Sequence, residues 1–424
     1  MNDPTSSSNP SKHSLVHSGT LTNPHESLIL GNGDLAATVQ VLSHEVVLSL
    51  GKGDVWDARV PQRTRDIVVT HDDLIASNGR LGDIRADRGS LQSTDYVQKS
   101  RRGPTPKRVG RVYLRHPGLS DTKVETRLDI GTGILTTEYG FAHGVLRVEA
   151  FVHRDANVLW VRLSAEGTIP WIHAGFEKAP DFVDPEMPDP RVTPDSTDNR
   201  WAISQTIPAG DGVAAFSWHL AGALPREGQC RRVYRTLDWR YAVTQDLELA
   251  DGESAVLAFA VTTDREDGED PLERAFGLVP EPGIEAYERA RREQVAAYAH
   301  FWSASGLSLE DGELEALWYR AVYGFSCHLA PGGQAPALNA NAPVFDYSAF
   351  NGFYTWNHNV QKWYFSAPAI NHAEWYEVFA DVMEQHMPVF AYLAELIFGL
   401  DGVYVDLMTA PFAPPERAKS AIDR

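Results

Sequence analysis

The chain has 424 residues, of which 43% are hydrophobic and 22% are charged, and its formal net charge is −19. This composition is typical of a soluble globular protein, and the length exceeds what one small core needs, so two domains are expected. The negative charge would repel a phosphate backbone, which argues against nucleic acid and anionic membrane surfaces as partners.

The chain opens with "MNDPTSSSNPSKHSLVHSG", which has neither the apolar stretch of a signal peptide nor an arginine-rich amphipathic character. We therefore predict a disordered tail over residues 1–26 and a cytoplasmic location. No run of about 18 apolar residues occurs, so no membrane span is expected. Cys230 and Cys327 lie far apart and are interpreted as reduced, packed thiols. We predict no metal site and no cofactor, and nothing in the sequence indicates an oligomeric state.

Residues 27–270 carry the pattern of antiparallel strands. "SLILGNGDLAATVQVLSHEVVLSL", residues 27–50, places two apolar runs around a Gly-Asn-Gly-Asp turn. Further alternating runs follow at 8–12-residue spacing from residue 110 onwards, which predicts a large two-sheet sandwich. Residues 61–108 are polar and basic, and we interpret them as a solvated excursion between strands; contact with an acidic ligand is the alternative.

The composition changes after an acidic hinge at residues 264–271, and helical patterns follow. We assign residues 271–310 to a linker with a helix and residues 311–424 to a helical domain. The predicted helices are, in chain order, one over 281–306 that Gly306 ends, one with Asp311 as N-cap, one from about Asn371 to Pro388, and one that ends at Gly399.

The segment "YTWNHNVQKWYF", residues 354–365, sets two amides among aromatic rings. If this segment is extended, Asn357 and Asn359 share one face and His358 points the other way. Two uncharged amides on one face can hold a water molecule or sugar hydroxyls, because each offers donors and an acceptor. The alternative is a packed aromatic cluster whose amides cap turns.

The spacing Asn-x-Asn-x-Gln-x-x-Tyr from Asn357 to Tyr364, followed by Asn371 and Glu374, resembles glycoside hydrolase family 95. This is the inverting α-L-fucosidase and α-L-galactosidase type, and uncharacterised domain families related to it share the pattern. "LILGNGDLAATV", "LSLGKGDVWDAR" and "LEALWYRAVYGFSC" resemble further segments of that family, so the resemblance extends from about residue 27 to about residue 390.

The resemblance implies an N-terminal β-supersandwich, a helical linker and the beginning of an (α/α)6 barrel that carries the site. It implies that Asn357 and Asn359 position the nucleophilic water, together with an aspartate base and a glutamate acid. The remaining residues of the motif are assigned to substrate binding: Trp356, His358, Gln361, Trp363 and Tyr364. Trp363 stands where the family has Asn, so fucose specificity is not implied.

The 144 residues from Glu281 to Arg424 are fewer than the roughly 190 that twelve helices and their connections need. We therefore expect a C-terminally truncated chain whose catalytic carboxylates lie beyond its end. Glu374, Asp381 and Glu384 are interpreted as a solvated helix face. The leading hypothesis is a glycoside hydrolase-like protein that acts with inversion on a carbohydrate. The alternatives are a glycoside phosphorylase of the related sandwich-plus-barrel type and a non-catalytic carbohydrate-binding protein.

Overall fold

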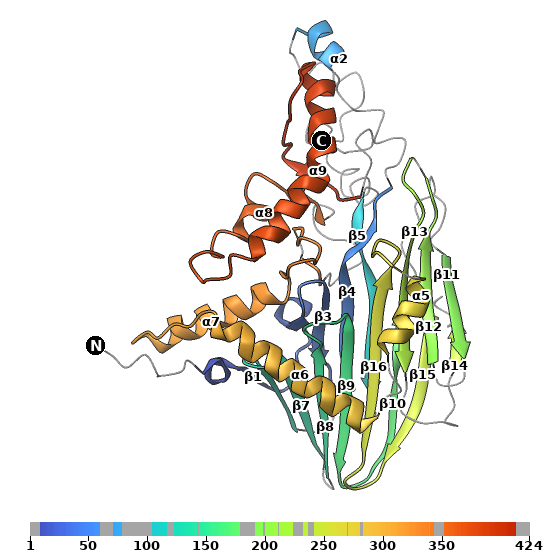
Figure 1. The fold of residues 1–424 in the computed structure, drawn as a ribbon. Coiled ribbons are helices and arrows are strands. Elements are labelled where there is room, and N and C mark those ends of the chain that lie inside the picture. The colour runs from blue at the N-terminus through green and yellow to red at the C-terminus, as the bar shows by residue number, and fades with distance from the viewer. Residues whose placement is uncertain are drawn as a thin grey trace.

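The computed structural model shows a large antiparallel β-sandwich followed by helices (Figure 1). This confirms the predicted order of a sandwich and then helices, whereas the barrel stays a prediction. The structure describes residues 9–59, 71–78, 104–116, 123–141, 144–178, 191–197, 200–210, 212–223, 232–235, 241–268, 270–279, 283–338, 340–342 and 352–412.

The larger sheet has nine strands within the described residues, and all of its neighbouring strands run antiparallel. In spatial order they are β1 (Leu15–Ser18), β6 (Lys123–Asp129), β7 (Ile134–Phe141), β8 (Gly144–Val152), β9 (Val158–Glu166), β16 (Ser254–Thr263), β13 (Phe216–Ala223), β12 (Arg200–Ile207) and β11 (Arg191–Thr197).

The second sheet has seven strands in the described part of the chain and is also antiparallel. In spatial order they are β14 (Arg232–Arg235), β15 (Tyr241–Leu249), β10 (Ile169–Lys178), β5 (Thr105–Arg115), β4 (Glu45–Asp57), β3 (Leu35–Val41) and β2 (Leu28–Gly31). The Gly-Asn-Gly-Asp turn joins β2 to β3, as its sequence predicts.

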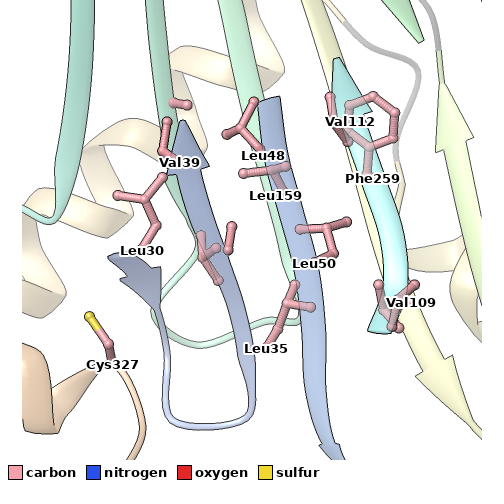
Figure 2. Packing of buried hydrophobic residues seen from close by; sticks show 14 of the residues in the cluster. Leu30, Leu35, Val39, Leu48, Leu50, Val109, Val112, Leu159, Phe259 and Cys327 are labelled. Atoms are coloured by element: carbon pink, nitrogen blue, oxygen red, sulfur yellow. The ribbon is translucent and has the colours of Figure 1, made fainter. Parts of the chain in front are cut away.

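The main hydrophobic core lies between the two sheets. Figure 2 shows Leu48 and Leu50 of β4 on one side and Leu159 of β9 and Phe259 of β16 on the other. All four are at most 1% exposed. Buried and more exposed side chains alternate along parts of β8 and β15. The buried side chains point into this core, and the others point away from it. Cys327 reaches the same cluster beside Leu30 (Figure 2), so its interpretation as a packed thiol fits. Cys230 lies outside the described residues.

Residues 9–26, which we expected to belong to a disordered tail, are ordered. Two short 3-10 helices, η1 (Pro10–His13) and η2 (Pro24–Glu26), flank β1, and β1 pairs with β6. Asn9 and Asn23 cap the two helices with their side chains. A four-residue edge strand with polar neighbours carries too little periodicity for sequence reasoning to detect, because its stability comes from pairing with β6.

Two helices pack on the outer face of the nine-stranded sheet. α6 (Ile284–Ser303) crosses this face and buries Tyr287 against Phe151 and Trp160 (Figure 1). α5 (Pro271–Leu278) lies against β13 and β16. The sequence pattern did not predict α5, because this helix directly follows the acidic hinge. The Asp270 side chain caps α5 by accepting hydrogen bonds from the backbone N–H groups of Leu272 and Glu273.

The remaining described helices are α2 (His71–Ala76), α7 (Gly312–Ser326), α8 (Asn359–Lys362) and α9 (Trp375–Phe398), and β17 (Tyr354–Thr355) pairs with β18 (Met408–Thr409). Asp311 is the N-cap of α7, and Gly399 ends α9 in the left-handed conformation, as predicted. The predicted break at Pro388 is wrong, because α9 continues through it. Proline in a helix interior costs about 3 kcal/mol, which the burial of Val382, Val389, Phe390 and Leu393 offsets.

α2 lies against the end of α9, where Gly399 approaches the ring of His71 (Figure 1). Of the polar and basic stretch 61–108, the structure describes residues 71–78 and 104–108, which contain α2 and the beginning of β5. The rest of that stretch lies outside the described residues. None of the described helices is long and apolar enough to cross a bilayer.

Candidate functional site

A groove of about 560 Å³ opens where the rim of the sandwich faces α9. We call it the junction groove. Carboxylates, two cations and two amide side chains line it, with one aromatic ring. Its sandwich side carries Asp34, Lys52, Asp54, Arg265, Glu266 and Asp267, and its helical side carries Gly332, Gly333, Gln334, Asp381, Glu384, Gln385 and Phe412.

The turn between β2 and β3 brings Asp34 to this groove. The Asn32 side chain accepts hydrogen bonds from the backbone N–H groups of Asp34 (3.0 Å) and Leu35 (2.8 Å). Its amide nitrogen donates to the carbonyl of His153 and to Asn157. Asn32 therefore fixes the turn from both sides, as a buried asparagine with satisfied donors and acceptors does.

The two glycines of this turn allow the sandwich to meet the helical part at backbone distance. A Cβ added at Gly31 would lie 2.4 Å from the carbonyl oxygen of Cys327. A Cβ added at Gly33, whose φ is +101°, would lie 2.3 Å from the Cβ of Ala330. The Gly33 N–H donates to the Cys327 carbonyl at 3.1 Å. The absence of side chains at the two glycines therefore allows the close contact between the sandwich and the helical part of the chain.

Lys52 occupies the floor of the groove and is 4% exposed. Its Nζ lies 2.8 Å from Asp34, 2.8 Å from Asp54 and 2.7 Å from Glu266. Thr263 Oγ1 donates to the second oxygen of Asp54, and Arg274 contacts Glu266. One buried ammonium therefore joins a turn, a strand interior and the segment that follows β16.

Burial and neighbouring charges together raise the pKa values of both Lys52 and Asp34. Burial by itself lowers the pKa of Lys52, but Asp34, Asp54 and Glu266 outweigh it and raise the pKa above its ordinary value. Burial raises the pKa of Asp34, and although Lys52 opposes this, the nearby charge of Asp54 adds to it. Lys52 is therefore charged over the whole neutral range.

Arg265 forms the wall between the junction groove and a neighbouring hollow. Its guanidinium lies 3.7 Å from the ring centroid of Phe216 and 3.7 Å from that of Phe412, and it donates to the Asp54 carbonyl. Burial lowers the pKa of Arg265 to about 10, so it stays charged at neutral pH. The two rings compensate its lost hydration by cation–π contact.

Three exposed carboxylates complete the groove: Asp267 on the sandwich side, and Asp381 and Glu384 on α9. None of the three forms an ion pair or hydrogen bond with another group in the described part of the chain. The groove thus offers carboxylate oxygens, together with the amides of Gln334 and Gln385, to a ligand. Such oxygens and amides are suited to bind hydroxyl groups, and charged carboxylates also bind cations.

The predicted asparagine pair lies on an exposed turn. The extended conformation ends at Thr355, residues 356–358 form a turn, and α8 begins at Asn359. The extended segment assumed for the shared face is therefore wrong beyond Thr355. Asn357, His358 and Asn359 are exposed, and none of them lines the junction groove. Their role stays a prediction.

The aromatic residues of the motif mostly belong to the core. Trp356 is buried, donates from Nε1 to Thr409 at 2.7 Å, and packs on His386 and Phe390 of α9. Tyr364 is also buried, so neither ring offers an open face to a sugar. Of the other motif residues, Gln361 donates a hydrogen bond to the Trp356 carbonyl at 2.9 Å. Trp363 is half-buried and packs against Phe325 and His328.

Sequence reasoning missed the groove. Asp381 and Glu384, interpreted as a solvated helix face, line it together, whereas Glu374 pairs with His372 at 2.7 Å instead. The available signal was Lys52 in a strand of mostly apolar, glycine and acidic residues, because a lysine buried in a strand needs carboxylate partners. Among the described residues, no group of three or more potential metal ligands is placed to hold a metal ion.

The fold defines a class of protein: a large antiparallel sandwich followed by helices, with a carboxylate-lined groove at their junction. The family model described as "Glycosyl hydrolase family 65, N-terminal domain" matches residues 9–266. The chain belongs to this family. This supports the resemblance stated above at the level of glycoside hydrolases and phosphorylases, and it does not single out family 95.

One solved structure with low sequence identity shares the fold. A putative kojibiose phosphorylase from the human microbiome matches all of this chain with a TM-score of 0.64 at 10% identity. The match covers 54% of that protein, so this chain spans about half its length. A family GH92 alpha-mannosidase from Bacteroides thetaiotaomicron matches 77% of this chain and 39% of its own, with a TM-score of 0.26 at 7% identity. No curated protein matches the chain in sequence.

Proposed function

We propose that the protein takes part in cleaving glycosidic bonds and that a saccharide binds in the junction groove. The membership of residues 9–266 in a glycosyl hydrolase family carries the proposal, because this family places a carbohydrate among its ligands. The groove supports it physically. It is concave, and carboxylates and amides from two parts of the fold converge on it.

Hydrolysis is the reaction that the charge of the groove favours. The groove lining has six carboxylates and two cations among the described residues. Lys52 is already held by three of the carboxylates, and Arg265 donates to the Asp54 carbonyl. The excess of carboxylates over cations therefore repels a phosphate ion. A hydrolase needs only water and paired carboxyl groups, as in the inverting family 95 type that the sequence resembles.

Phosphorolysis is the second candidate, because the fold of a putative kojibiose phosphorylase matches this chain over its whole length. In that case the phosphate binds outside the junction groove. Under either reaction we propose that α7, α8 and α9 are the first helices of an (α/α)6 barrel. Asn357 and Asn359 then lie on the exposed turn that enters α8, where they position water or a sugar hydroxyl.

A substrate panel distinguishes these reactions. The purified protein is incubated with α- and β-linked glucose disaccharides, including kojibiose, and with aryl α-L-fucosides and α-L-galactosides, with and without inorganic phosphate. Hydrolysis releases reducing sugar without phosphate, and phosphorolysis releases a sugar 1-phosphate only with it. If no glycoside is cleaved but saccharides bind, the protein is a carbohydrate-binding module. If nothing is cleaved or bound, the proposed function is wrong.

A further inference from the structure

We propose that the outer face of the seven-stranded sheet carries a second saccharide-binding site, in which the indole of Trp171 stacks against an uncharged, gluco-configured oligosaccharide. The inference goes beyond the proposed function, which concerns the junction groove, and it takes from that function only that the ligand is a carbohydrate. It stands on three observations: an exposed indole at a β-bulge, a row of rings that holds this indole, and a carboxylate opposite it that has no partner among the described residues.

Trp171 lies in a β-bulge of β10. Ile169 is paired with Leu249 and Ile172 with Leu247, so residues 170 and 171 lie opposite one residue of β15. The extra residue lets both isoleucines reach the core, although residues three apart in a regular strand point to opposite faces. Trp171 points away from the core. Among the tryptophans that the structure describes it is the exposed one, at 41%.

A row of rings holds the indole in place. The imidazole of His173, two residues further along the same face of β10, stacks on Trp171 with ring centroids 5.8 Å apart and an interplanar angle of 20°. The ring of Tyr113 follows at 5.7 Å from His173, and the Arg115 guanidinium lies 4.0 Å from the Tyr113 centroid. A Cβ added at Gly175 would lie 3.1 Å from the Tyr113 hydroxyl oxygen, so this glycine leaves room for Tyr113. The indole is therefore oriented before a ligand arrives, which lowers the entropic cost of binding.

Two exposed carboxylates on β15 lie next to the indole. Asp246 holds the imidazole of His173, with Oδ1 2.7 Å from Nδ1. Glu248 is the residue opposite the bulge, and it is exposed on the same face as Asp246. It forms no ion pair or hydrogen bond with any other residue that the structure describes. Its carboxylate oxygens are therefore available to accept hydrogen bonds from ligand hydroxyl groups.

The chemistry of these groups selects the class of ligand. The non-anomeric hydroxyl groups of a gluco-configured ring are equatorial, so C–H groups cover both of its faces. Such a face packs flat on an indole, while the hydroxyl groups at the edge of the sugar ring reach Glu248. Asp246 and Glu248 repel an anionic sugar. The family model of a glycosyl hydrolase domain matches residues 9–266, which contain the whole site.

The site is separate from the junction groove. Arg115 is paired with Glu45 at the beginning of β4, and Lys52 in the floor of the groove comes seven residues later in this strand. At about 3.3 Å per residue the two positions are roughly 20 Å apart. Neither Trp171 nor Glu248 lines the groove. A saccharide bound at Trp171 is therefore held on the protein without reaching the carboxylates of the groove.

Fluorine NMR tests the site, because it reports on single indoles in protein that contains 5-fluorotryptophan. The probes are maltoheptaose and cellohexaose, and the Trp171 resonance is assigned by its absence in Trp171→Phe. We expect this resonance to shift in a saturable manner with at least one of the two probes. Glu248→Gln keeps the size of the side chain but weakens its acceptors, so the Kd read from the same resonance should increase about threefold.

Calorimetry with matched variants measures how many oligosaccharides bind. Trp171→Ala should bind one fewer of the effective probe per chain than the wild type. Tyr376→Ala removes a ring of α9 that is similarly exposed, at 42%, and lies outside the site; it should keep the stoichiometry of the wild type. Because both side chains are exposed, thermal unfolding of the two variants should differ little from that of the wild type.

The outcomes separate the two proposals. A Trp171 resonance that neither probe shifts, or a stoichiometry that is unchanged in Trp171→Ala, would overturn the second site and leave the proposed function intact. A site at Trp171 that binds as expected, together with an inactive substrate panel and no binding in the junction groove, would support this inference and contradict the proposed function.

Discussion

The ammonium of Lys52 lies 2.8 Å from the carboxylate of Asp34, and it joins the first turn of the sandwich to the strand that forms the floor of the groove. Two more carboxylates, of Asp54 and Glu266, share this ammonium. The cluster is therefore both a structural connection and one contributor to the negative potential in the groove.

Replacing Lys52 by methionine should destabilise the protein strongly. The change keeps the length of the side chain but leaves three carboxylates without their common counter-ion. Removing one partner of a buried ionic cluster costs about 3–5 kcal/mol. Urea denaturation measures the loss in free energy of unfolding. Lys12→Met, at an exposed lysine of η1, should change it by less than about 0.5 kcal/mol. Equal stability of both variants would show that the Lys52 cluster contributes nothing.

Gly33→Ala should loosen the contact between the sandwich and the helical part. The new methyl group would overlap Ala330, and the positive φ adds strain; together we expect a loss of about 2–4 kcal/mol. Gly19→Ala is the matched control, because Gly19 has a similar φ of +94° but nothing within 4 Å of an added Cβ. Thermal unfolding of both variants checks this. If the Gly19 variant is as unstable as the Gly33 variant, backbone strain alone accounts for the loss of stability.

His328 should make the protein sensitive to mild acid. Burial lowers the pKa of His328 to about 4 from its ordinary 6.5. The unfolded chain therefore binds more protons between these values, and stability falls as the pH decreases through this window. Between pH 7 and pH 5 the loss should be about 2 kcal/mol.

Denaturation of wild type and His328→Leu at the two pH values measures this loss. The Leu variant should lose about 2 kcal/mol less than the wild type. His300→Gln, at an exposed histidine of α6, should leave the dependence unchanged. A wild type equally stable at both pH values would contradict the burial of a neutral imidazole.

Asn357→Ala and Asn359→Ala test the predicted water-positioning pair. Both residues are exposed, so stability should change by less than about 0.5 kcal/mol. If they position water, the rate of glycoside cleavage should fall by roughly 10²–10³ for each, the magnitude typical of a lost polar contact to the transition state. Activity on the best substrate of the panel gives the answer. Unchanged rates in both variants would remove these asparagines from the reaction.

Local patterns predicted the elements that local chemistry determines. The apolar runs around the Gly-Asn-Gly-Asp turn predicted β2 and β3, Asp311 predicted the beginning of α7, and Gly399 predicted the end of α9. Pro388 wrongly predicted the end of a helix, because the burial of neighbouring side chains outweighs the low helix propensity of proline.

The groove could not be predicted in the same way. Lys52 and Glu266 lie at opposite ends of the sandwich sequence, and only the pairing of β4 with β3 and β5 and the return of β16 bring them together. Asp381 and Glu384 look like an ordinary solvated face until the sandwich lies opposite them. The asparagine motif was visible because it is contiguous, whereas the groove is built from segments that are distant in the sequence.

Backbone hydrogen exchange in the presence of a bound saccharide tests the central claim, which is that sugar binds in the junction groove. The most tightly bound saccharide of the panel is added at a saturating concentration, and exchange is followed by mass spectrometry. We predict protection at residues 265–267, 332–334, 381, 384 and 385, which line the groove. Protection confined to residues 356–364, or none at all in a protein that binds the sugar, would contradict the claim.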